Sequence, residues 1–267
     1  MAYTTIDDPS AYFQTVLYSG NGSTQSITND GNSDLQPDWL WFKNRNDTQV
    51  HQLFDTNRGI ANSLRSNGTD AENTDDPNDR LTAINSDGFS LGDDGNPNNG
   101  SNTYVCWQWK ANGGTTSSNS SGSITSTVQA NTTAGFSIVT YTGTQSNATV
   151  GHGLGAVPSW IITKCRSATN GWPIFHHKNT SAPETELIRL NETAATADNS
   201  VPWNDTAPTS TVFTVGANDE NNKSSATQIA YCFAEKQGYS KFGSYTGNGN
   251  ADGPFVYTGF KPAWVMI

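Results

Sequence analysis

The sequence predicts an all-β protein made of tandem β-sandwich or jelly-roll-like modules that are joined by a flexible linker. Three observations lead to this expectation: a composition rich in turn-forming residues, large aromatic residues spread along the chain, and a pattern that recurs after about a hundred residues. Of the 267 residues, 33% are hydrophobic and 14% are charged. Asn, Ser, Thr, Gly and Asp fill most other positions, as is typical of turns and short strands.

The aromatic content and the charge narrow the class of protein. Eight Trp, nine Tyr and eleven Phe distinguish the chain from a disordered one, because disordered segments lack large aromatic side chains. The net charge of −10 argues against nucleic acid as a partner, since phosphate binding requires a basic surface. No apolar run approaches the ~18 residues of a membrane span, so we expect no membrane insertion.

The three cysteines, Cys106, Cys165 and Cys232, each lie in a strand-like run. Their number is odd and no two are spaced like metal ligands, so neither a disulfide framework nor a metal site is indicated. We expect buried thiols that remain reduced.

A repeated pattern gives the module boundaries. Three segments begin with Phe, continue through Tyr and Gly, and reach Pro-x-Trp; they cover residues 13–45, 136–166 and 242–267. In the first two copies Pro, Trp, Lys and Arg keep the same spacing, so that Trp39 corresponds to Trp160. Such matches over long separations indicate a true repeat.

The agreement continues toward the end of the module. Residues 89–92 match residues 213–216, and the aromatic segments that follow align Cys106 with Cys232. The chain then divides into a leader at 1–12, β module 1 at 13–111, a Ser/Gly/Asn linker at 112–123, β module 2 at 124–237, and the start of a truncated module 3 at 239–267. The linker composition is typical of a flexible chain. Because the third copy stops early in its pattern, we expect the natural chain to continue.

Each module is expected to consist of β-strands. From Trp39 to Arg45 the side chains alternate with a period of two, and Pro37 and Pro158 precede their strands, where a missing N–H does least harm. Only residues 53–64 and 184–197 show a helical tendency. Closely spaced short strands with turn signals between them favour a sandwich or a jelly roll.

The motif Tyr-Thr-Gly-Asn-Gly, followed by Gly-Phe-x-Pro-x-Trp-Val, resembles a module of uncharacterised function in predicted virion proteins of marine tailed phages, notably cyanophages. Residues 64–72, 150–155 and 232–243 are similar to that module as well. The resemblance covers nearly the whole chain. It implies a virion structural protein that is assembled in the host cytoplasm, and it supplies no catalytic residues.

Histidines are the first candidates for chemistry, at His51, His152, His176 and His177. A general base or a metal site needs convergent carboxylates or a nucleophile. Module 1 places His51 near the position of His176 but has Asn32 or Ser33 at that of His152. Hydrogen bonding at turns is therefore favoured over catalysis.

Clustered carboxylates are the second candidates, because two of them suffice for polysaccharide hydrolysis. They lie in polar loops at Asp70, Glu72, Asp75, Asp76, Asp79, Asp93, Asp94, Asp219 and Glu220. Solvated turns are favoured here. For the loops at 93–94 and 219–220, calcium binding stays an alternative, because Ca²⁺ prefers oxygen ligands such as these carboxylates. Their spacing does not match an EF-hand. We assign no catalytic, cofactor-binding or metal-binding residue.

The recurring tryptophans are the third candidates. Trp39, Trp160 and Trp264, with Lys43 and Lys164 nearby, would suit a platform for sugar stacking. A residue kept at one place in every module favours a core position instead.

These observations favour a tail fibre or appendage subunit that attaches the virion to the host surface, with residues 1–12 as its anchor. The alternative is a capsid-surface decoration or a lectin-like carbohydrate-binding protein, and a polysaccharide-degrading tailspike ranks third. Expected partners are other virion proteins, a host-surface glycan or protein receptor, and further copies of the chain, with a trimer favoured.

Overall fold

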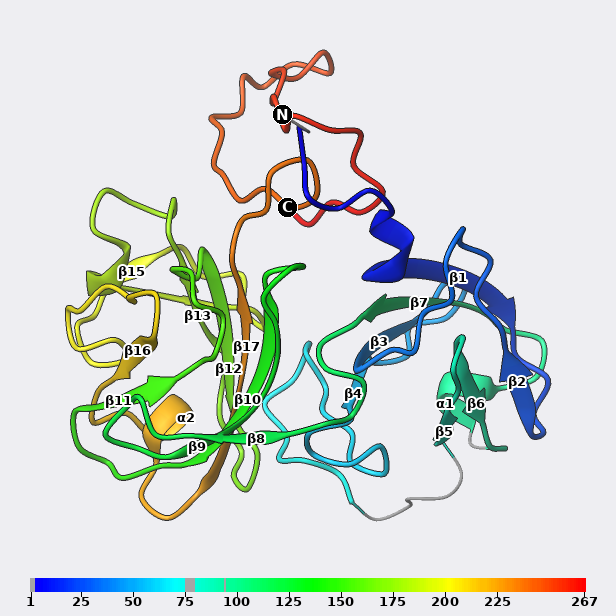
Figure 1. The fold of residues 1–267 in the computed structure, drawn as a ribbon, viewed down its shortest axis with the longest axis horizontal. Helices are drawn as coiled ribbons and strands as arrows, with labels where there is room; N and C mark the ends of the chain where they lie inside the picture. Colours follow the sequence, from blue (N-terminus) through cyan, green and yellow to red (C-terminus); the bar gives the residue numbers. More distant parts are fainter. Residues whose placement is uncertain (1–2, 75–79, 94) are drawn as a thin grey trace.

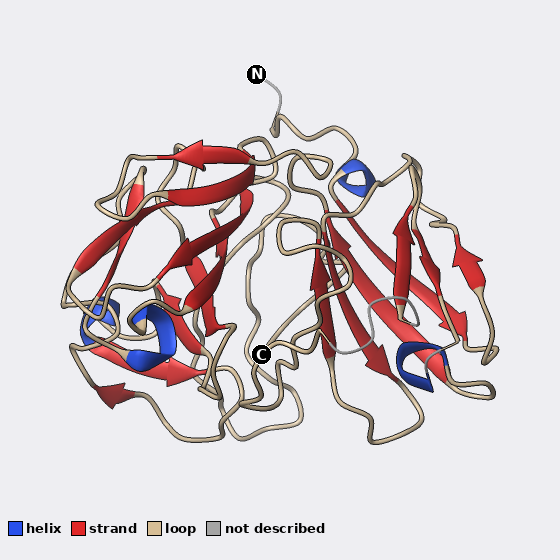
Figure 2. Ribbon diagram, turned by 90° about the horizontal axis from the view of Figure 1, so that it is seen from below, coloured by secondary structure: helices blue, strands red, loops and turns tan. Residues whose placement is uncertain are grey.

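The structure, a computed structural model, describes residues 3–74, 80–93 and 95–267, and over these residues the protein is all-β with antiparallel strand pairs (Figure 1). Two bodies of strands lie side by side, and Figure 2 shows the same two bodies from below. We call residues 13–111 the first repeat and residues 124–237 the second repeat. None of the helices in the described ranges is long and apolar enough to cross a membrane.

The first repeat forms two sheets. The larger sheet has the strand order β1-β7-β3-β4 and the smaller one β2-β6-β5. The elements are a 3₁₀ turn at Pro9–Ala11, β1 (Phe13–Ser19), β2 (Gln25–Ile27), β3 (Trp39–Asn44), β4 (Gln52–Asp55), β5 (Leu81–Ile84), β6 (Phe89–Leu91), α1 (Gly95–Asn98) and β7 (Thr103–Trp109).

The second repeat, together with β8 from the segment before it, forms a larger sheet of order β15-β14-β13-β12-β17-β10-β9-β8, and it also contains a pair, β11-β16. The elements are β8 (Ser117–Asn119), β9 (Ser126–Asn131), β10 (Phe136–Thr142), β11 (Ala148–Gly151), β12 (Trp160–Cys165), β13 (Pro173–His176), a 3₁₀ turn at Pro183–Thr185, β14 (Glu186–Arg189), β15 (Ala197–Asp198), β16 (Val212–Val215), α2 (Asp219–Asn222) and β17 (Thr227–Phe233).

The central strands of the two repeats have the same order and register. Strand β7 lies between β1 and β3, as β17 lies between β10 and β12. Trp39 pairs with Trp109 at the start of β3, and Trp160 pairs with Phe233 at the start of β12. Trp39 and Trp160 therefore occupy equivalent positions.

The same register corrects the expected match between two cysteines. Three residues before Trp109 lies Cys106, and three residues before Phe233 lies Ala230, so these two are equivalent. Cys232 corresponds to Gln108 instead, and the sequence alignment was displaced by two residues. The expectation about the thiols themselves is confirmed, because all three cysteines are free and buried.

The central core lies between the repeats rather than inside either one. It joins buried aromatic residues of both larger sheets, and we call it the aromatic seam: Trp39, Trp41, Leu53, Leu64, Trp109, Ala111, Phe136, Ile138, Trp160, Ile162, Trp172, Ile174, Ile229, Tyr231 and Phe233. Each repeat also has a smaller core on the opposite face of its larger sheet. Burial of this much aromatic surface ties the two repeats into one body.

The segment at 112–123, expected as a flexible linker, is instead held in place. The buried carboxylate of Asp38 accepts hydrogen bonds from the backbone N–H groups of Ala111, Gly113 and Gly114 at 2.7, 2.9 and 2.6 Å. Farther along, β8 pairs with β9. The composition misled the prediction because small side chains cannot form a core, whereas backbone hydrogen bonds need no side chain.

The two expected helical tendencies are also wrong. The segment at 53–64 contains part of strand β4 and a bridge from Leu53 to Leu64, and the segment at 184–197 contains β14. Tertiary pairing outweighed the weak local preference.

The N-terminal leader contacts the C-terminal segment at residues 241–267. The Tyr3 hydroxyl donates to the carbonyl of Gly259 at 2.7 Å. Residues 241–267, where the sequence predicted the start of a third module, form no strand, but Trp264 packs with its ring centroid 5.5 Å from that of Trp109. The leader thus contacts the C-terminal segment of its own chain.

Candidate functional site

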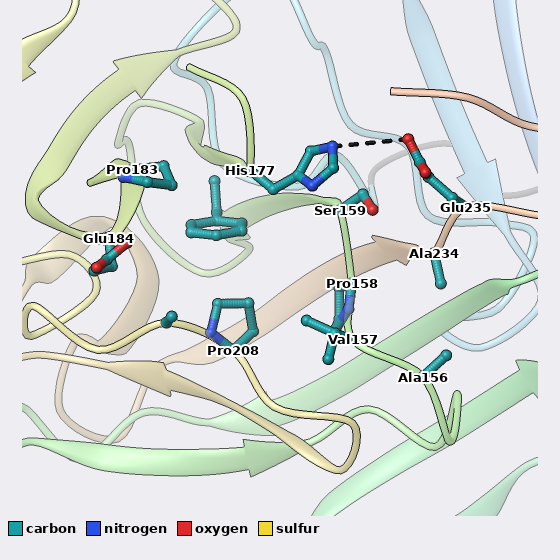
Figure 3. Close-up of a pocket in the computed structure, with 12 residues that line it drawn as sticks. Ala156, Val157, Pro158, Ser159, His177, Pro183, Glu184, Pro208, Ala234 and Glu235 are labelled. Atoms are coloured by element: carbon teal, nitrogen blue, oxygen red, sulfur yellow. Dashed lines mark ion pairs between the residues drawn. The ribbon is translucent and has the colours of Figure 1, made fainter. Parts of the chain in front are cut away.

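An open groove lies on the surface of the second repeat (Figure 3). It has a volume of about 420 Å³, and its walls come from the loop before β12, the end of β13, the 3₁₀ turn before β14, the loop before β16 and the residues after β17. Three prolines, three alanines, Val157 and Phe175 make most of it apolar, and four polar residues complete it: Ser159, His177, Glu184 and Glu235. Such a mixture is typical of a ligand site.

One end of the groove carries an ordered His–Glu pair. The Nε2 of His177 lies 3.8 Å from Oε1 of Glu235 and 3.2 Å from the carbonyl oxygen of Phe242. Glu235 also accepts from the backbone N–H of Phe242 and from the Lys241 ammonium, each at 3.0 Å. Burial alone would raise the pKa of Glu235, but these donors outweigh it and lower the pKa. The carboxylate is therefore ionised and fixed in direction.

The other end carries a carboxylate that is not engaged by the protein. Glu184 makes no hydrogen bond or ion pair with the described residues, and Figure 3 shows it across the groove from Glu235. No arginine or lysine lines the groove. A ligand that donates hydrogen bonds would meet an acceptor at either end.

The groove does not assemble a nucleophile. Ser159, His177 and Glu235 share one end, but the side chain of Ser159 makes no hydrogen bond to the His177 ring within the described set of contacts. Acyl-transfer chemistry needs that contact between nucleophile and base. The arrangement suits recognition of a ligand.

The equivalent place in the first repeat is sealed. Asp38 and Ser159 are equivalent, because their backbone N–H groups bind the carbonyls of Trp109 and Phe233 in the same register. Asp38 is fully buried and holds the chain at 111–114 against itself. Ser159 cannot bind three amides, and the chain after β17 takes another course. The two copies thus differ at this place, where Asp38 binds the chain at 111–114 and Ser159 lines the groove.

The predicted histidines take part in hydrogen bonds at turns and strand ends. His152 is buried, its Nε2 lies 3.1 Å from the carbonyl of Thr209, and burial lowers its pKa. His51 accepts from the Trp41 indole at 2.8 Å, and burial lowers its pKa to about 4. The match of His51 with His176 is wrong, because the register makes Asp55 the equivalent of His176.

The predicted carboxylates separate into several places. Glu72 is part of a charged network at the seam, whereas Asp70 forms an exposed pair with Arg65. Asp219 and Glu220 pair with Lys223 and Arg189. Asp75, Asp76, Asp79 and Asp94 lie outside the described residues. Within the described ranges no three or more His, Cys, Asp or Glu residues are grouped as metal ligands.

The charged network joins the two repeats. The fully buried side chain of Arg58 binds Asp55 and donates to Glu72 at 2.6 Å, and Arg166 of the second repeat binds the same carboxylate at 2.7 Å. The Tyr231 hydroxyl donates to Asp55 at 2.7 Å. These contacts hold the loop at 56–72 against the second repeat.

The tryptophan column does not form a sugar platform. Trp39 and Trp160 are buried in the seam and Trp264 packs against it. Lys164 is buried beneath Trp172, where it donates to the carbonyls of Thr69 and Asn170 and where burial lowers its pKa to about 8.

Sequence reasoning missed the groove residues Glu184 and Glu235. The sequence signal that could have pointed to the groove was a difference between the two copies. The first copy has an acid after Pro37, whereas the second copy has a serine after Pro158, in an otherwise similar pattern.

Comparison with known proteins adds a family. The model of a family described as a domain of unknown function (DUF7483) matches residues 8–267. No curated protein and no solved structure matches the chain.

Proposed function

The chain belongs to the DUF7483 domain family, and from that premise we propose that it is a structural protein of a tailed-phage virion, a tail fibre or appendage subunit that contacts the host surface. The motif resemblance stated above is the reason for assigning the protein to a virion. The protein's working part is a surface that binds, and no reaction is proposed for it.

The aromatic seam is the observation that carries this proposal. Two tandem sandwich-like repeats that share one core form a stiff block, whereas repeats on a flexible linker would form loose beads. A stiff block transmits position and load, which suits a part of a particle. The N-terminal leader at 1–12 remains our proposed anchor to another virion protein.

The groove of the second repeat is the proposed contact with the host. Its acceptors Glu184 and Glu235 lie on opposite sides of apolar walls, so it offers carboxylates to hydroxyl or amide donors of a surface glycan. The same observation favours the alternative, a capsid-surface decoration or lectin-like protein. The polysaccharide-degrading tailspike ranks third, because the general acid of a glycosidase needs a raised pKa, whereas the pKa of Glu235 is lowered by its hydrogen-bond donors.

Antibody labelling of particles that contain this protein tests the proposal. Label at the tail or on fibres is the expected result, and label spread over the capsid supports the decoration protein. Absence of the protein from purified particles overturns both. Deletion of residues 2–12 should leave the protein folded but remove it from particles if the leader is the anchor.

Binding of the full chain to host-surface polysaccharide tests the groove separately. We expect Glu184→Gln to weaken binding at least tenfold without a change in thermal midpoint. The matched control is Glu186→Gln, two residues farther along on β14 and outside the groove lining. Equal binding by both variants contradicts a role for the groove.

A further inference from the structure

Strand β1 has one open edge. The carbonyl of Tyr12 accepts from Lys110 and the N–H of Gly20 donates to Asn102, so residues of even number in this strand direct their backbone groups toward β7. The odd-numbered residues direct theirs away from the sheet, and within the described residues no backbone group pairs with them. Of these outward groups, the carbonyl of Ser19 accepts from the Gln25 side chain.

The second repeat shows what covers such an edge. Its equivalent strand, β10, pairs on the corresponding side with β9, antiparallel and in register from Phe136 opposite Asn131 to Thr140 opposite Thr127. In the first repeat the residues that correspond to β9 belong to the leader, and they turn away to contact Gly238 and Gly259. The edge covered in one repeat is uncovered in the other.

The sequence of β1 does nothing to protect this edge. Natural sheets guard their edges with charges, prolines, bulges or very short strands. Strand β1 has seven residues, Phe-Gln-Thr-Val-Leu-Tyr-Ser, with no charge and no proline, and Leu17 is 59% exposed. The other edge of this sheet is occupied, since Leu53 of β4 exchanges both backbone hydrogen bonds with Leu64. The edge strands of the larger second-repeat sheet, β8 and β15, have only three and two residues.

We infer that β1 is an assembly edge that pairs antiparallel with β1 of a second copy of this chain. A two-fold axis at Val16 places Thr15 of each copy opposite Leu17 of the other, and it aligns the outward backbone groups of the odd-numbered residues of the two strands. The two four-stranded sheets then become one continuous sheet.

The distribution of charged residues allows this pairing, although each copy carries a net charge of −10. Residues 13–29 contain no charged side chain, and in the antiparallel arrangement the acidic Asp7 and Asp8 before one strand meet the neutral residues after the other. Like charges therefore stay apart at the contact. The self-complementary edge gives a dimer, and not the trimer favoured from the sequence. This inference is independent of the proposed function, because it rests on strand geometry alone.

Sedimentation analysis of the full 267-residue chain over a dilution series tests the inference. The expected mass is twice the 28.6 kDa of one chain. Leu17→Pro removes an outward N–H that the monomer does not use, and Leu17→Lys places a charge on the edge; both should give monomers with the circular dichroism spectrum unchanged. Thr127→Lys, an exposed change on the already paired β9, should leave the dimer intact.

Hydrogen exchange supplies a second readout. The amides of Thr15 and Leu17 should be protected in the wild-type protein and exchange fast in Leu17→Lys, while the amides of β10 keep their protection in both. A wild-type monomer at every concentration, a trimer, or a dimer that survives both Leu17 variants overturns the inference. Protected β1 amides in a monomer overturn it too, since they place the leader of the same chain on the edge.

Discussion

The ring of Trp39 stacks on the ring of Tyr231 with centroids 4.4 Å apart and planes 20° from parallel, although the two residues belong to different repeats and are separated by most of the chain. The hydroxyl of the same Tyr231 donates to Asp55, which binds Arg58. Aromatic packing and a buried ionic network thus meet at one point of the seam. The stability of each repeat depends on the other.

Removal of the central cation should be costly. Arg58→Met leaves Asp55 buried without its cation and breaks the contact to Glu72, and we expect a loss of about 3 kcal/mol in the free energy of unfolding. Urea denaturation measures it. Arg65→Met is the matched control, because the Arg65–Asp70 pair is exposed and its removal should cost less than about 1 kcal/mol. Equal losses from the two variants contradict the network's role.

Acid should weaken the same network. Burial raises the pKa of Glu72, but the hydrogen bond from Arg166 and the charge of Arg58 outweigh it and lower the pKa below its ordinary 4.5. The unfolded chain therefore takes up this proton first as the pH falls below about 4.5, and the stability that Glu72 contributes above that pH is lost as the pH falls through its lowered folded value.

Unfolding curves from neutral pH down to about 3 measure this dependence. In Glu72→Gln the decline should be shallower than in the wild type. Other acids, such as Asp8, whose pKa is lowered by hydrogen bonds from Ser10 and Ser33, are present in both chains, so the difference between the curves isolates Glu72. Parallel curves contradict the assignment.

The three thiols should react slowly in the native protein. Burial raises the pKa of Cys106 and of Cys232 well above the ordinary value, so neither forms a thiolate near neutral pH, and Cys165 is buried as well. Labelling with a thiol reagent should be slow in buffer and stoichiometric in denaturant. Fast labelling of any one cysteine in buffer shows that its strand opens.

Local patterns predicted the strands but not the way in which they share a core. Alternation and the matched spacing of Pro, Trp and Lys located β3 and β12, but these strands are buried on both faces, which the alternation did not predict. These local patterns could not predict the aromatic seam, because the residues around Trp39 in the sequence do not indicate that Tyr231 packs on it. The groove was equally hidden, because its acids Glu184 and Glu235 come from unrelated loops and acquire meaning only through their placement.

The cysteine register illustrates a narrower limit. Residues 89–92 and 213–216 were aligned correctly, and the same offset carried forward makes Cys106 equivalent to Ala230. Matching the two cysteines instead required an insertion that the strands do not contain. Identity of a rare residue was a weaker guide than a constant spacing.

The same constant spacing aligns Asn98 with Asn222, and these two asparagines make equivalent hydrogen bonds in the two repeats. Each is fully buried. Asn98 donates to the carbonyls of Gly92 and Ser23, both at 2.6 Å, and its side-chain oxygen accepts from the N–H of Asn21 at 3.1 Å.

Asn222 repeats these contacts one by one. It donates to the carbonyls of Gly216 and Ser146 at 2.8 and 2.7 Å, and it accepts from the N–H of Thr144 at 2.8 Å. Asn98 therefore joins the turn after β1 to the short helix before β7, and Asn222 joins the turn after β10 to the short helix before β17.

Alanine at either position should destabilise the whole protein. The substitution leaves two carbonyls and one N–H without their partner in a buried place, and we expect a loss of about 3 kcal/mol for Asn98→Ala and for Asn222→Ala alike. Because the seam couples the repeats, each variant should lower the midpoint of a single calorimetric transition rather than create a second one. Ser224→Ala, an exposed change near Asn222, should leave the midpoint unchanged. Two separate transitions, with only one of them moved by each variant, show that the repeats fold independently and that the seam does not couple them.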